Sequence, residues 1–425
     1  MIPDNPCPTP SFAALIGLDW GDRQHAVALW TPDSQAPESF DLEHSPENVR
    51  RWLKQIEERF SGRPVALAVE TSKGPLINML FEVPWLSIYP IHPATSARMR
   101  KAFTPSGAKD DPQDALLLLG LLRDHLDRLR PLPPEDLLTR KLGALCELRR
   151  KSVDRRTQLT NQLRAALKGY YPQALELVGD ILHSPLALAF LKRWPDLIEL
   201  KASRPSTIKT FYYRHNLRRP EAIQKRVDRI AQAVALTVDE AVVSAGRREV
   251  ARLIEELAVI QKHIRQDEKL IAEHFAQHPD APLFRELPGA GAALAPRLLV
   301  AFGTDRDRYP SAAALQRYSG VAPVKEKSGN RVWVHWRWNA PRFLRQTLIE
   351  WAGQTVLYSQ WARAYYQQKK EHGKHHWSIL RSLAFIWLRI LWKCWQTNTP
   401  YNEERYLEAL RRQGSPLLQS MSKSC

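Results

Sequence analysis

Cysteine is scarce in this chain of 425 residues, which contains only Cys7, Cys146, Cys394 and Cys425. No two of them form a CxxC pair, so the sequence offers neither a disulfide framework nor a usual zinc motif. The N-terminus also lacks a basic segment followed by an apolar core, the pattern of a signal peptide. These absences favour a protein of the reducing cytoplasm.

Long apolar runs without charge are missing as well. The most apolar late segment, residues 377–395, contains Arg381, Arg389 and Lys393. Each charge at the centre of a membrane costs roughly 2.5–3.5 kcal/mol. We therefore expect a core or amphipathic helix here, and no membrane partner.

Acidic residues are outnumbered, with 45 Asp and Glu against 62 Lys and Arg, a formal net charge of +17. The hydrophobic fraction of 44% is that of a folded globular protein. A basic excess along a folded chain favours a polyanionic partner such as nucleic acid. A soluble basic protein without such a partner is the alternative.

Four acids nevertheless stand at informative positions. Asp19 and Glu70 end the apolar runs of residues 13–18 and 65–69, and Asp111 and Asp114 open a helix. Carboxylates at the ends of buried strands are costly unless something pairs with them. Converging carboxylates suit Mg²⁺, and two such ions can hold both sides of a phosphodiester. Helix capping alone would also explain Asp111 and Asp114.

The apolar patterns predict an α/β domain over residues 1–130, followed by a mainly α-helical remainder. Its predicted strands are residues 12–19, 25–30, 38–42, 65–70 and 86–90, and its predicted helices are 46–60, 75–81 and a segment from Pro112. Three strands followed by alternating helices and strands is the order of a ribonuclease-H-like domain with a mixed sheet. Such a sheet would bring the four acids together.

Two long helices are predicted in the middle region, residues 131–280. They cover residues 135–171 and 234–275, and their apolar spacing suggests an antiparallel pair or coiled coil. The pattern of residues 183–233, punctuated by Pro and Arg, predicts no definite structure. Five basic residues of the first helix are candidate nucleic-acid contacts: Arg149, Arg150, Lys151, Arg155 and Arg156.

A third domain is predicted over residues 281–412, with a disordered Ser-rich tail over 413–425. It begins with a helix-hairpin-helix-like turn in which Gly289 and Gly291 could let backbone N–H groups approach a phosphate. An ordinary turn between helices explains these glycines equally well.

Ser328 lies in a basic turn, residues 325–331, before a predicted strand over residues 332–338. By itself Ser-Gly-Asn is typical of a turn, and a serine becomes a nucleophile only when it is activated. Basic and aromatic neighbours could contact nucleic acid, although most tryptophans are expected in the core: Lys325, Lys327, Arg331, Trp333 and Arg337.

Taken in order, these motifs resemble the DEDD transposases of the bacterial insertion-sequence-110 family. The N-terminal blocks are Ile16-Gly-Leu-Asp19, Ala68-Val-Glu70 and Lys109-Asp-Asp-Pro-Gln-Asp-Ala115. The C-terminal blocks are Leu287-Pro-Gly-Ala-Gly291, Phe302-Gly303, Tyr318-Ser-Gly-Val-Ala-Pro323, Ser328-Gly329, Phe343-Leu-Arg345, Tyr365-Tyr366 and Tyr401-Asn402. The resemblance covers nearly the whole chain.

The resemblance implies a RuvC-like domain joined by a coiled coil to a serine-bearing transposase domain. It implies that the four acids hold Mg²⁺ and that Ser328 attacks DNA to form a covalent phosphoserine. It also implies donor and target DNA, a structured bridge RNA as guide, a homo-oligomer (dimer or tetramer) and a place on the bacterial nucleoid.

Two departures from the family pattern affect the site. Asp110 stands where Thr or Ser is usual, and Ser319 stands where an apolar residue is usual and so becomes a second serine candidate.

Two other functions stay open. One is a structure-selective nuclease that uses water in place of serine, and the other is an inactive nucleic-acid-binding descendant of a transposase.

Overall fold

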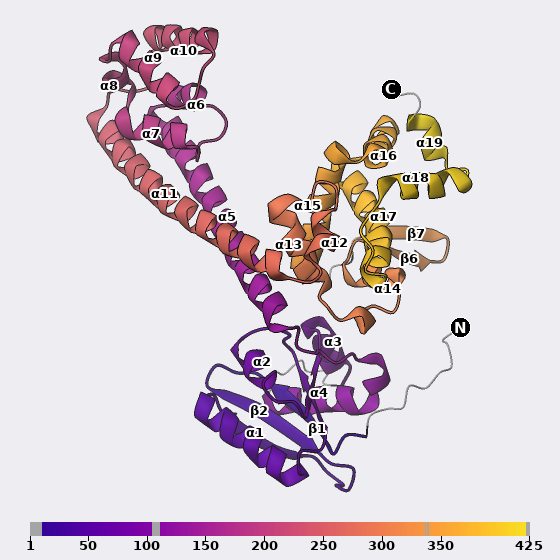
Figure 1. Ribbon diagram of the computed structural model, residues 1–425. Coiled ribbons are helices and arrows are strands. Elements are labelled where there is room, and N and C mark those ends of the chain that lie inside the picture. The colour runs from indigo at the N-terminus through magenta and orange to yellow at the C-terminus, as the bar shows by residue number, and fades with distance from the viewer. Residues whose placement is uncertain (1–10, 104–110, 336, 338–339, 422–425) are drawn as a thin grey trace. The chain divides into compact units, whose positions relative to one another are not determined.

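The computed structural model describes residues 11–103, 111–335, 337 and 340–421. The chain folds into two compact units, Met1–Glu135 and Asp136–Cys425, whose elements are labelled in Figure 1. The division falls at the end of the proline-rich linker, slightly after the boundary predicted at residue 130.

A mixed five-stranded sheet forms the centre of the first unit, in the order β3–β2–β1–β4–β5. Strand β1 pairs antiparallel with β2 and parallel with β4, which confirms the predicted mixed sheet. The strands are β1 (Ala14–Asp19), β2 (Gln24–Trp30), β3 (Glu38–Glu43), β4 (Val65–Val69) and β5 (Leu86–Pro90). The helices are α1 (Pro46–Phe60), α2 (Pro75–Leu80), α3 (Pro93–Phe103), α4 (Asp111–Asp124) and the short η1 (Leu126–Arg128).

Helices cover both faces of this sheet. Helix α1 begins at the N-cap Ser45 and buries Val49, Leu53 and Ile56 along one side, a spacing that follows the helical repeat. With α2 it covers the face that carries Ile16 and Leu18. Helix α4 packs on the opposite face. The central strands β1 and β4 are therefore apolar on both sides, whereas the edge strand β3 is mostly exposed.

The contact between β1 and α4 depends on Gly17. A Cβ atom at Gly17 would lie 2.1 Å from the carbonyl oxygen of Ala115 and 2.5 Å from the backbone nitrogen of Leu119. We expect Gly17→Ala to lower the free energy of unfolding by about 1–3 kcal/mol, because α4 must move away from the sheet. Denaturant unfolding measures this change.

Gly120→Ala, a substitution on helix α4, is the matched control for Gly17→Ala on strand β1. A Cβ at Gly120 meets nothing within 4 Å among the described residues, and alanine has the better helix propensity, worth up to about 1 kcal/mol. Gly120→Ala should therefore keep or raise the stability. Equal unfolding curves for Gly17→Ala and the unaltered protein would contradict the close approach of α4.

Two long helices, α5 (Leu137–Tyr170) and α11 (Glu240–Gln277), pack along each other in the second unit. Arg149 pairs with Glu268 and Arg155 with Glu256, so the helices run antiparallel. The second helix begins six residues later than predicted because Asp239 caps it, its side chain accepting a hydrogen bond from the N–H of Ala241. Figure 1 shows the pair leading away from the C-terminal helices.

Residues 183–233, which the sequence left unassigned, form together with the preceding helix α6 a lobe of short helices at the far end of this pair (Figure 1). They are α6 (Gln173–Val178), α7 (Pro185–Arg193), α8 (Leu197–Lys201), α9 (Pro205–Arg214) and α10 (Pro220–Gln232). Aromatic rings fill the lobe, with the Trp194 ring centroid 5.1 Å from that of Phe190 and 4.9 Å from that of Phe211. Proline stands in the first turn of α7, α9 and α10, where its missing N–H is no loss.

The C-terminal half of the second unit is helical around a buried group of tryptophans: Trp351, Trp361, Trp387 and Trp395. Its helices are α12 (Ala281–Arg285), α13 (Gly291–Phe302), η2 (Arg306–Arg308), α14 (Ala312–Tyr318), α15 (Arg342–Tyr358), α16 (Gln360–Glu371), α17 (His376–Gln396), α18 (Glu403–Arg412) and α19 (Pro416–Met421). Trp52 and Trp194 are buried as well, and four more tryptophans pack against the cores, which confirms that most of the fourteen serve the core: Trp20, Trp30, Trp85 and Trp392. Among the described residues no helix is long and apolar enough to span a bilayer.

Two predictions for this half are wrong. The segment predicted as a basic turn forms a strand, β6 (Val324–Ser328), which pairs antiparallel with β7 (Arg331–His335). The tail predicted to be disordered contains α19, because Leu417 and Leu418 pack on the tryptophan-rich core. This helix has only six residues, too few for a periodic apolar pattern to predict it.

Candidate functional site

Strand alternation places Asp19 and Glu70 on the face of the sheet that α4 covers. Asp19 follows Leu15 and Gly17 at every second position, and Glu70 continues the side of Ala66 and Ala68. Leu18 pairs with Val69 in the parallel register, so the two acids leave neighbouring strands at the same edge.

Helix α4 supplies the other two acids in its first turn. Asp19, Asp111 and Asp114 each offer one carboxylate oxygen, and these three oxygens lie within 4.8 Å of one another. The structure therefore brings three of the four predicted acids together. Asp110, the neighbouring departure from the family pattern, lies outside the described residues.

Asp114 is the most informative member of this acid cluster. Only 2% of the residue is exposed, and its Oδ1 accepts a hydrogen bond of 2.6 Å from Nε of Arg100. Its Oδ2 is buried and has no hydrogen-bond partner among the described residues. A buried carboxylate oxygen left unsatisfied is costly, whereas a hard divalent cation would satisfy it. The three oxygens thus fit an Mg²⁺ ion.

Glu70 stands outside this group of three. Its Oε1 accepts a hydrogen bond from the hydroxyl of Ser96, which also donates to the carbonyl of Pro93 at 3.0 Å. Ser96 and Arg100 both belong to α3, which the sequence analysis missed because the helix is short and poorly amphipathic. Proline at its first position was the one available sign of its start.

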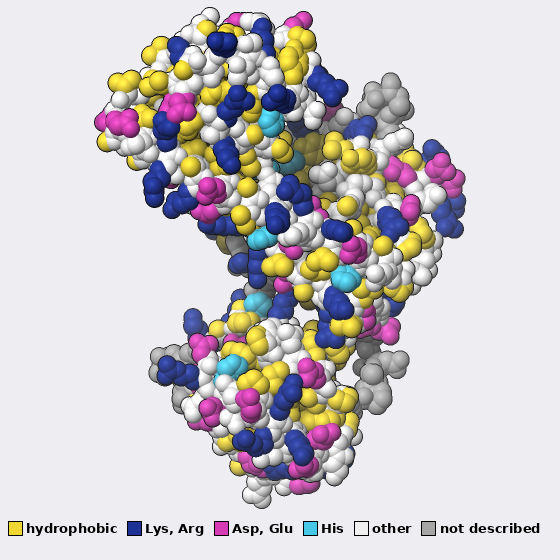
Figure 2. Space-filling view, turned by 60° about the vertical axis from the view of Figure 1, so that its left-hand side comes forward, with side chains coloured by type: hydrophobic (Ala, Val, Ile, Leu, Met, Phe, Trp, Pro, Cys, Tyr) yellow, Lys and Arg dark blue, Asp and Glu magenta, His cyan; other side chains and the backbone are white. Residues whose placement is uncertain are grey.

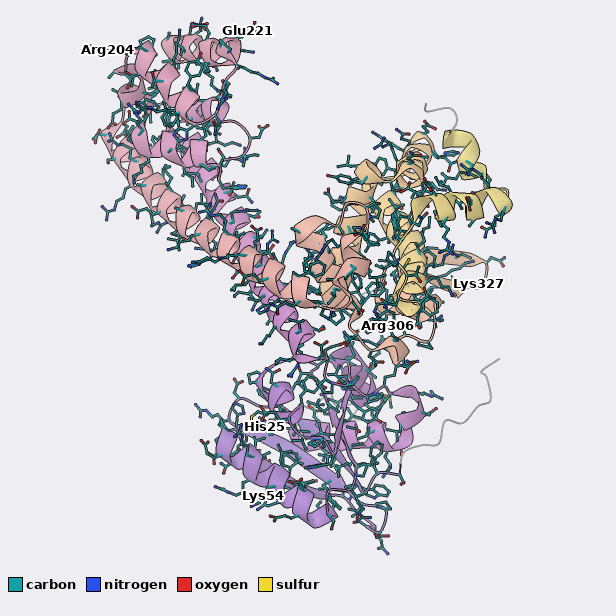
Figure 3. All side chains as sticks on the ribbon, viewed as in Figure 1. His25, Lys54, Arg204, Glu221, Arg306 and Lys327 are labelled. Carbon is teal, nitrogen blue, oxygen red and sulfur yellow. The ribbon has the colours of Figure 1, made fainter. Side chains whose placement is uncertain are left out.

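The turn after Asp19 is held by a pair of histidines; His25 is labelled in Figure 3. The N–H of Gly21 donates to Nδ1 of His25 at 3.2 Å, so the His25 proton sits on Nε2, which lies 3.1 Å from Nδ1 of His44. Burial, and then the nearby His44, lower the pKa of His25. His25 is therefore neutral near pH 7, and Trp20 packs against both rings.

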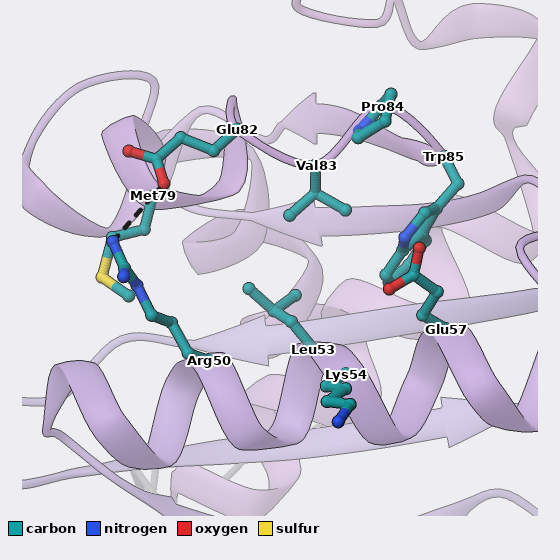
Figure 4. Close-up of a pocket in the computed structure, with 9 residues that line it drawn as sticks. All are labelled: Arg50, Leu53, Lys54, Glu57, Met79, Glu82, Val83, Pro84 and Trp85. Carbon is teal, nitrogen blue, oxygen red and sulfur yellow. Dashed lines mark ion pairs between the residues drawn. The ribbon is translucent and has the colours of Figure 1, made fainter.

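A hollow on the other face of the sheet carries none of the predicted site residues. Figure 4 shows it between α1 and the segment that leads into β5, with a volume of about 340 Å³. Arg50 and Glu82 form an ion pair of 3.6 Å across it, and both side chains are largely exposed. Exposed pairs of this kind contribute little to stability.

Ser328 occupies the tip of the hairpin β6–β7 and is exposed. It lies directly opposite Arg331, joined by a turn in which Gly329 has φ of 57°. Two residues further along each strand, Glu326 pairs with Trp333. Because side chains alternate between the faces of a strand, Glu326 and Trp333 lie on the same face as Ser328. On the same face, His335 Nε2 lies 2.8 Å from Glu326 Oε1.

The other predicted contacts of this hairpin are also open to solvent. Lys325, Lys327 and Arg331 are exposed, and Trp333 is 69% exposed, unlike the core tryptophans. Arg337 is half-buried and its carbonyl accepts a hydrogen bond from Arg345 at 3.1 Å. Trp336 and Trp338 lie outside the described residues.

Ser319, the second serine candidate, is placed very differently. It is fully buried at the end of α14. Its hydroxyl donates to the carbonyl of Gln316 at 3.0 Å and accepts from the N–H of Val321 at 3.4 Å. A hydroxyl engaged in this way inside the core cannot meet a DNA phosphate without local unfolding.

Most of the arginines predicted to contact nucleic acid from α5 have protein partners. Arg149 pairs with Glu268 at 2.6 Å and Arg155 with Glu256 at 2.9 Å, both on α11. Arg150 pairs with Glu350 of α15 at 3.0 Å. Lys151 is exposed, and Arg156 is half-buried. Figure 2 shows Lys and Arg spread over the visible face, interspersed with acids, with no single basic stripe.

Glu350 joins α5 to the C-terminal helices. It also accepts a hydrogen bond of 2.5 Å from the buried Arg297. Burial acts to raise the pKa of Glu350, but the hydrogen bond from Arg297 and the charges of Arg297 and Arg150 hold it below its ordinary value. These arginines therefore have a structural role that their spacing in the sequence did not reveal.

The two turn glycines differ in their surroundings. Gly289 has φ of 69°, and a Cβ there would lie 3.0 Å from Gln354 and Tyr358 of α15. Gly291 has φ of 53°, opens α13 and is exposed. Packing against α15 explains Gly289, which is half-buried, whereas Gly291 is exposed.

Comparison with known proteins matches both ends of the chain to transposase families. Residues 16–172 match the profile of DEDD transposases of the IS110 type, described as a transposase. Residues 281–367 match the profile of transposases of the IS116/IS110/IS902 family. The first match includes all four predicted acids, and the second includes Ser319 and Ser328.

Several insertion-element proteins are similar to the chain over nearly their whole length. The mini-circle transposase named for IS117 of Streptomyces coelicolor is 28% identical, covering 96% of this chain and 99% of that protein. The 43.6 kDa protein of IS110, also from Streptomyces coelicolor, is 24% identical over 92% and 96%. The 42 kDa protein of IS900 from Mycobacterium paratuberculosis is 24% identical over 91% and 96%.

Proposed function

This chain belongs to the IS110 family of transposases, and on that premise we propose that it cuts and rejoins DNA under the guidance of a structured bridge RNA. The observation that carries the chemistry is the acid cluster of Asp19, Asp111 and Asp114, in which the buried Oδ2 of Asp114 has no hydrogen-bond partner within the described part of the chain. The mixed sheet that positions the cluster supports a RuvC-like domain.

The acids would act by holding a divalent cation. When bound, Mg²⁺ would neutralise the charge that develops on the phosphodiester. Asp19 is positioned by the end of β1, and Asp111 and Asp114 by the first turn of α4. Because α4 packs closely on Gly17, the three carboxylates would keep their mutual spacing. Glu70 lies nearby, directly after the neighbouring strand β4.

Ser328 would be the nucleophile. Its Oγ would form a bond to the scissile phosphorus while the bond from phosphorus to a deoxyribose oxygen breaks. That oxygen would take up a proton, and the serine proton would pass to a base. A hydroxyl of the second DNA strand would reverse the step and release the serine. Exposure at the hairpin tip and the adjacent Arg331, a phosphate ligand by chemistry, support this role.

The exposed hairpin residues would contact nucleic acid. Lys325, Lys327 and Arg331 would bind phosphates, and Trp333 would stack on a base or ribose. Helices α5 and α11 would serve as the coiled coil of a dimer or tetramer. In this assembly the acids of one subunit would act together with the serine of another subunit.

The test is a strand-transfer assay with DNA that contains the ends of the element, the co-purified RNA and Mg²⁺. A protein–DNA adduct that survives denaturation is expected with Mg²⁺ and is expected to disappear with a chelator. Cleavage without an adduct would instead indicate the water-using nuclease. Neither cleavage nor adduct would indicate the inactive descendant. Sequencing the co-purified RNA should yield one structured species, and ribosomal fragments alone would contradict RNA guidance.

A further inference from the structure

Helix α3 presents two side chains to the acids from one of its faces. Ser96 and Arg100 are four residues apart, which places them one turn apart on the same side. Ser96 donates to Glu70, and Arg100 donates to Asp114 with a side chain only 22% exposed. One short helix therefore engages one acid from the sheet and one from α4.

These contacts leave an unequal set of metal ligands. Oε1 of Glu70 and Oδ1 of Asp114 already accept hydrogen bonds. Asp19, Asp111 and Asp114 each place one oxygen in the close group, and Oδ2 of Asp114 is buried with no hydrogen-bond partner among the described residues. Four carboxylates and one guanidinium have a formal charge of −3, which one divalent cation reduces to −1. Without the guanidinium the formal charge would be −4, which two divalent cations neutralise. A second cation would need ligands on the side of Glu70 and Asp114 Oδ1, about 3.5–4 Å from the first.

We propose that Ser96 and Arg100 are positioning residues that divide the four acids, so that the protein without nucleic acid binds one divalent cation and not two. Arg100 takes the place of the second cation, and Ser96 holds Glu70 away from it. This inference rests on the proposed function of the acids as metal ligands. It adds a stoichiometry and the residue that sets it.

An ordinary structural ion pair is the competing explanation for Arg100 and Asp114. Such a pair would affect stability but not the number of ions bound. Counting bound ions separates the two explanations, because a second ion enters only if Arg100 had kept it out.

The experiment measures Mn²⁺ binding to the full chain without nucleic acid, with free Mn²⁺ counted by electron paramagnetic resonance. We expect one ion per chain for the unaltered protein and for Arg100→Lys, which keeps the charge. We expect two for Arg100→Gln, which frees Oδ1 of Asp114 from a cation. Ser96→Ala frees Glu70 while it keeps the Arg100–Asp114 pair, and one ion is expected there because Arg100 still takes the place of the second cation.

Arg98→Gln is the matched control, since Arg98 lies on α3 but is exposed, and one ion is expected. Two ions in the unaltered protein would overturn the inference. So would two ions in Ser96→Ala, or one ion in Arg100→Gln when the circular dichroism of that variant equals that of Arg98→Gln. Asp111→Asn should lose the tight ion, and if it does not, the proposed metal site itself fails.

Discussion

Replacing Ser328 by alanine is expected to abolish strand transfer, with a loss of at least about 10³-fold, while DNA and RNA binding persist. The physical reason is that removal of a covalent nucleophile leaves only binding and electrostatic contributions to catalysis. Ser328 is exposed at the end of β6, so its truncation should leave the fold intact. The measurements are strand-transfer yield, the denaturation-resistant adduct and a gel-shift titration.

Ser319→Ala distinguishes the two serines. Because the Ser319 hydroxyl is buried and engaged with Gln316, its loss should cost about 1 kcal/mol of stability and leave the adduct in place. An adduct that persists in Ser328→Ala but disappears in Ser319→Ala would show that the nucleophile is Ser319. A fully active Ser328→Ala protein would show that Ser328 is not the nucleophile.

Asp114→Asn is expected to reduce Mg²⁺-dependent cleavage by more than 100-fold, a larger loss than the 10–100-fold typical of residues that only support a metal ligand. The amide keeps the shape of the side chain and can still accept from Arg100. It removes the charge from the one buried carboxylate oxygen that has no hydrogen-bond partner among the described residues. Cleavage rate against Mg²⁺ concentration measures the loss.

Asp124→Asn is the control on the same helix. Asp124 is exposed and pairs with Arg123 at 2.8 Å at the other end of α4, so cleavage should be unchanged. Equal loss in both variants would show a general effect on α4. Full activity of Asp114→Asn at low Mg²⁺ would remove the carboxylate cluster from the mechanism.

Much of the fold was predictable because it follows local periodicity. The continuous apolar runs of residues 13–18 and 65–69 predicted the central strands, and the helical spacing of Val49, Leu53 and Ile56 predicted α1. The lobe of α7–α10 was not predictable in the same way. Its prolines were interpreted as interruptions, yet three of them lie in the first turns of helices, and each helix is too short for a clear period.

The candidate site was predictable in its residues but only partly in its contacts. The ends of two strands and the start of a helix identified four acids. The partners of two of them, Ser96 and Arg100, come from a helix without a strong amphipathic pattern. Likewise, the charge of the α5 arginines was visible, whereas their pairing with α11 and α15 depends on residues about 100 to 200 positions away.

By itself, then, the sequence determined the class of each domain, the excess of positive charge and the four acids, because each is a property of composition or short-range spacing. Only the tertiary structure decided that Asp19, Asp111 and Asp114 meet while Glu70 is held by Ser96. It also decided that Ser328 is exposed and Ser319 buried. These outcomes depend on which surfaces pack together, and packing joins residues whose separation along the chain carries no periodic signal.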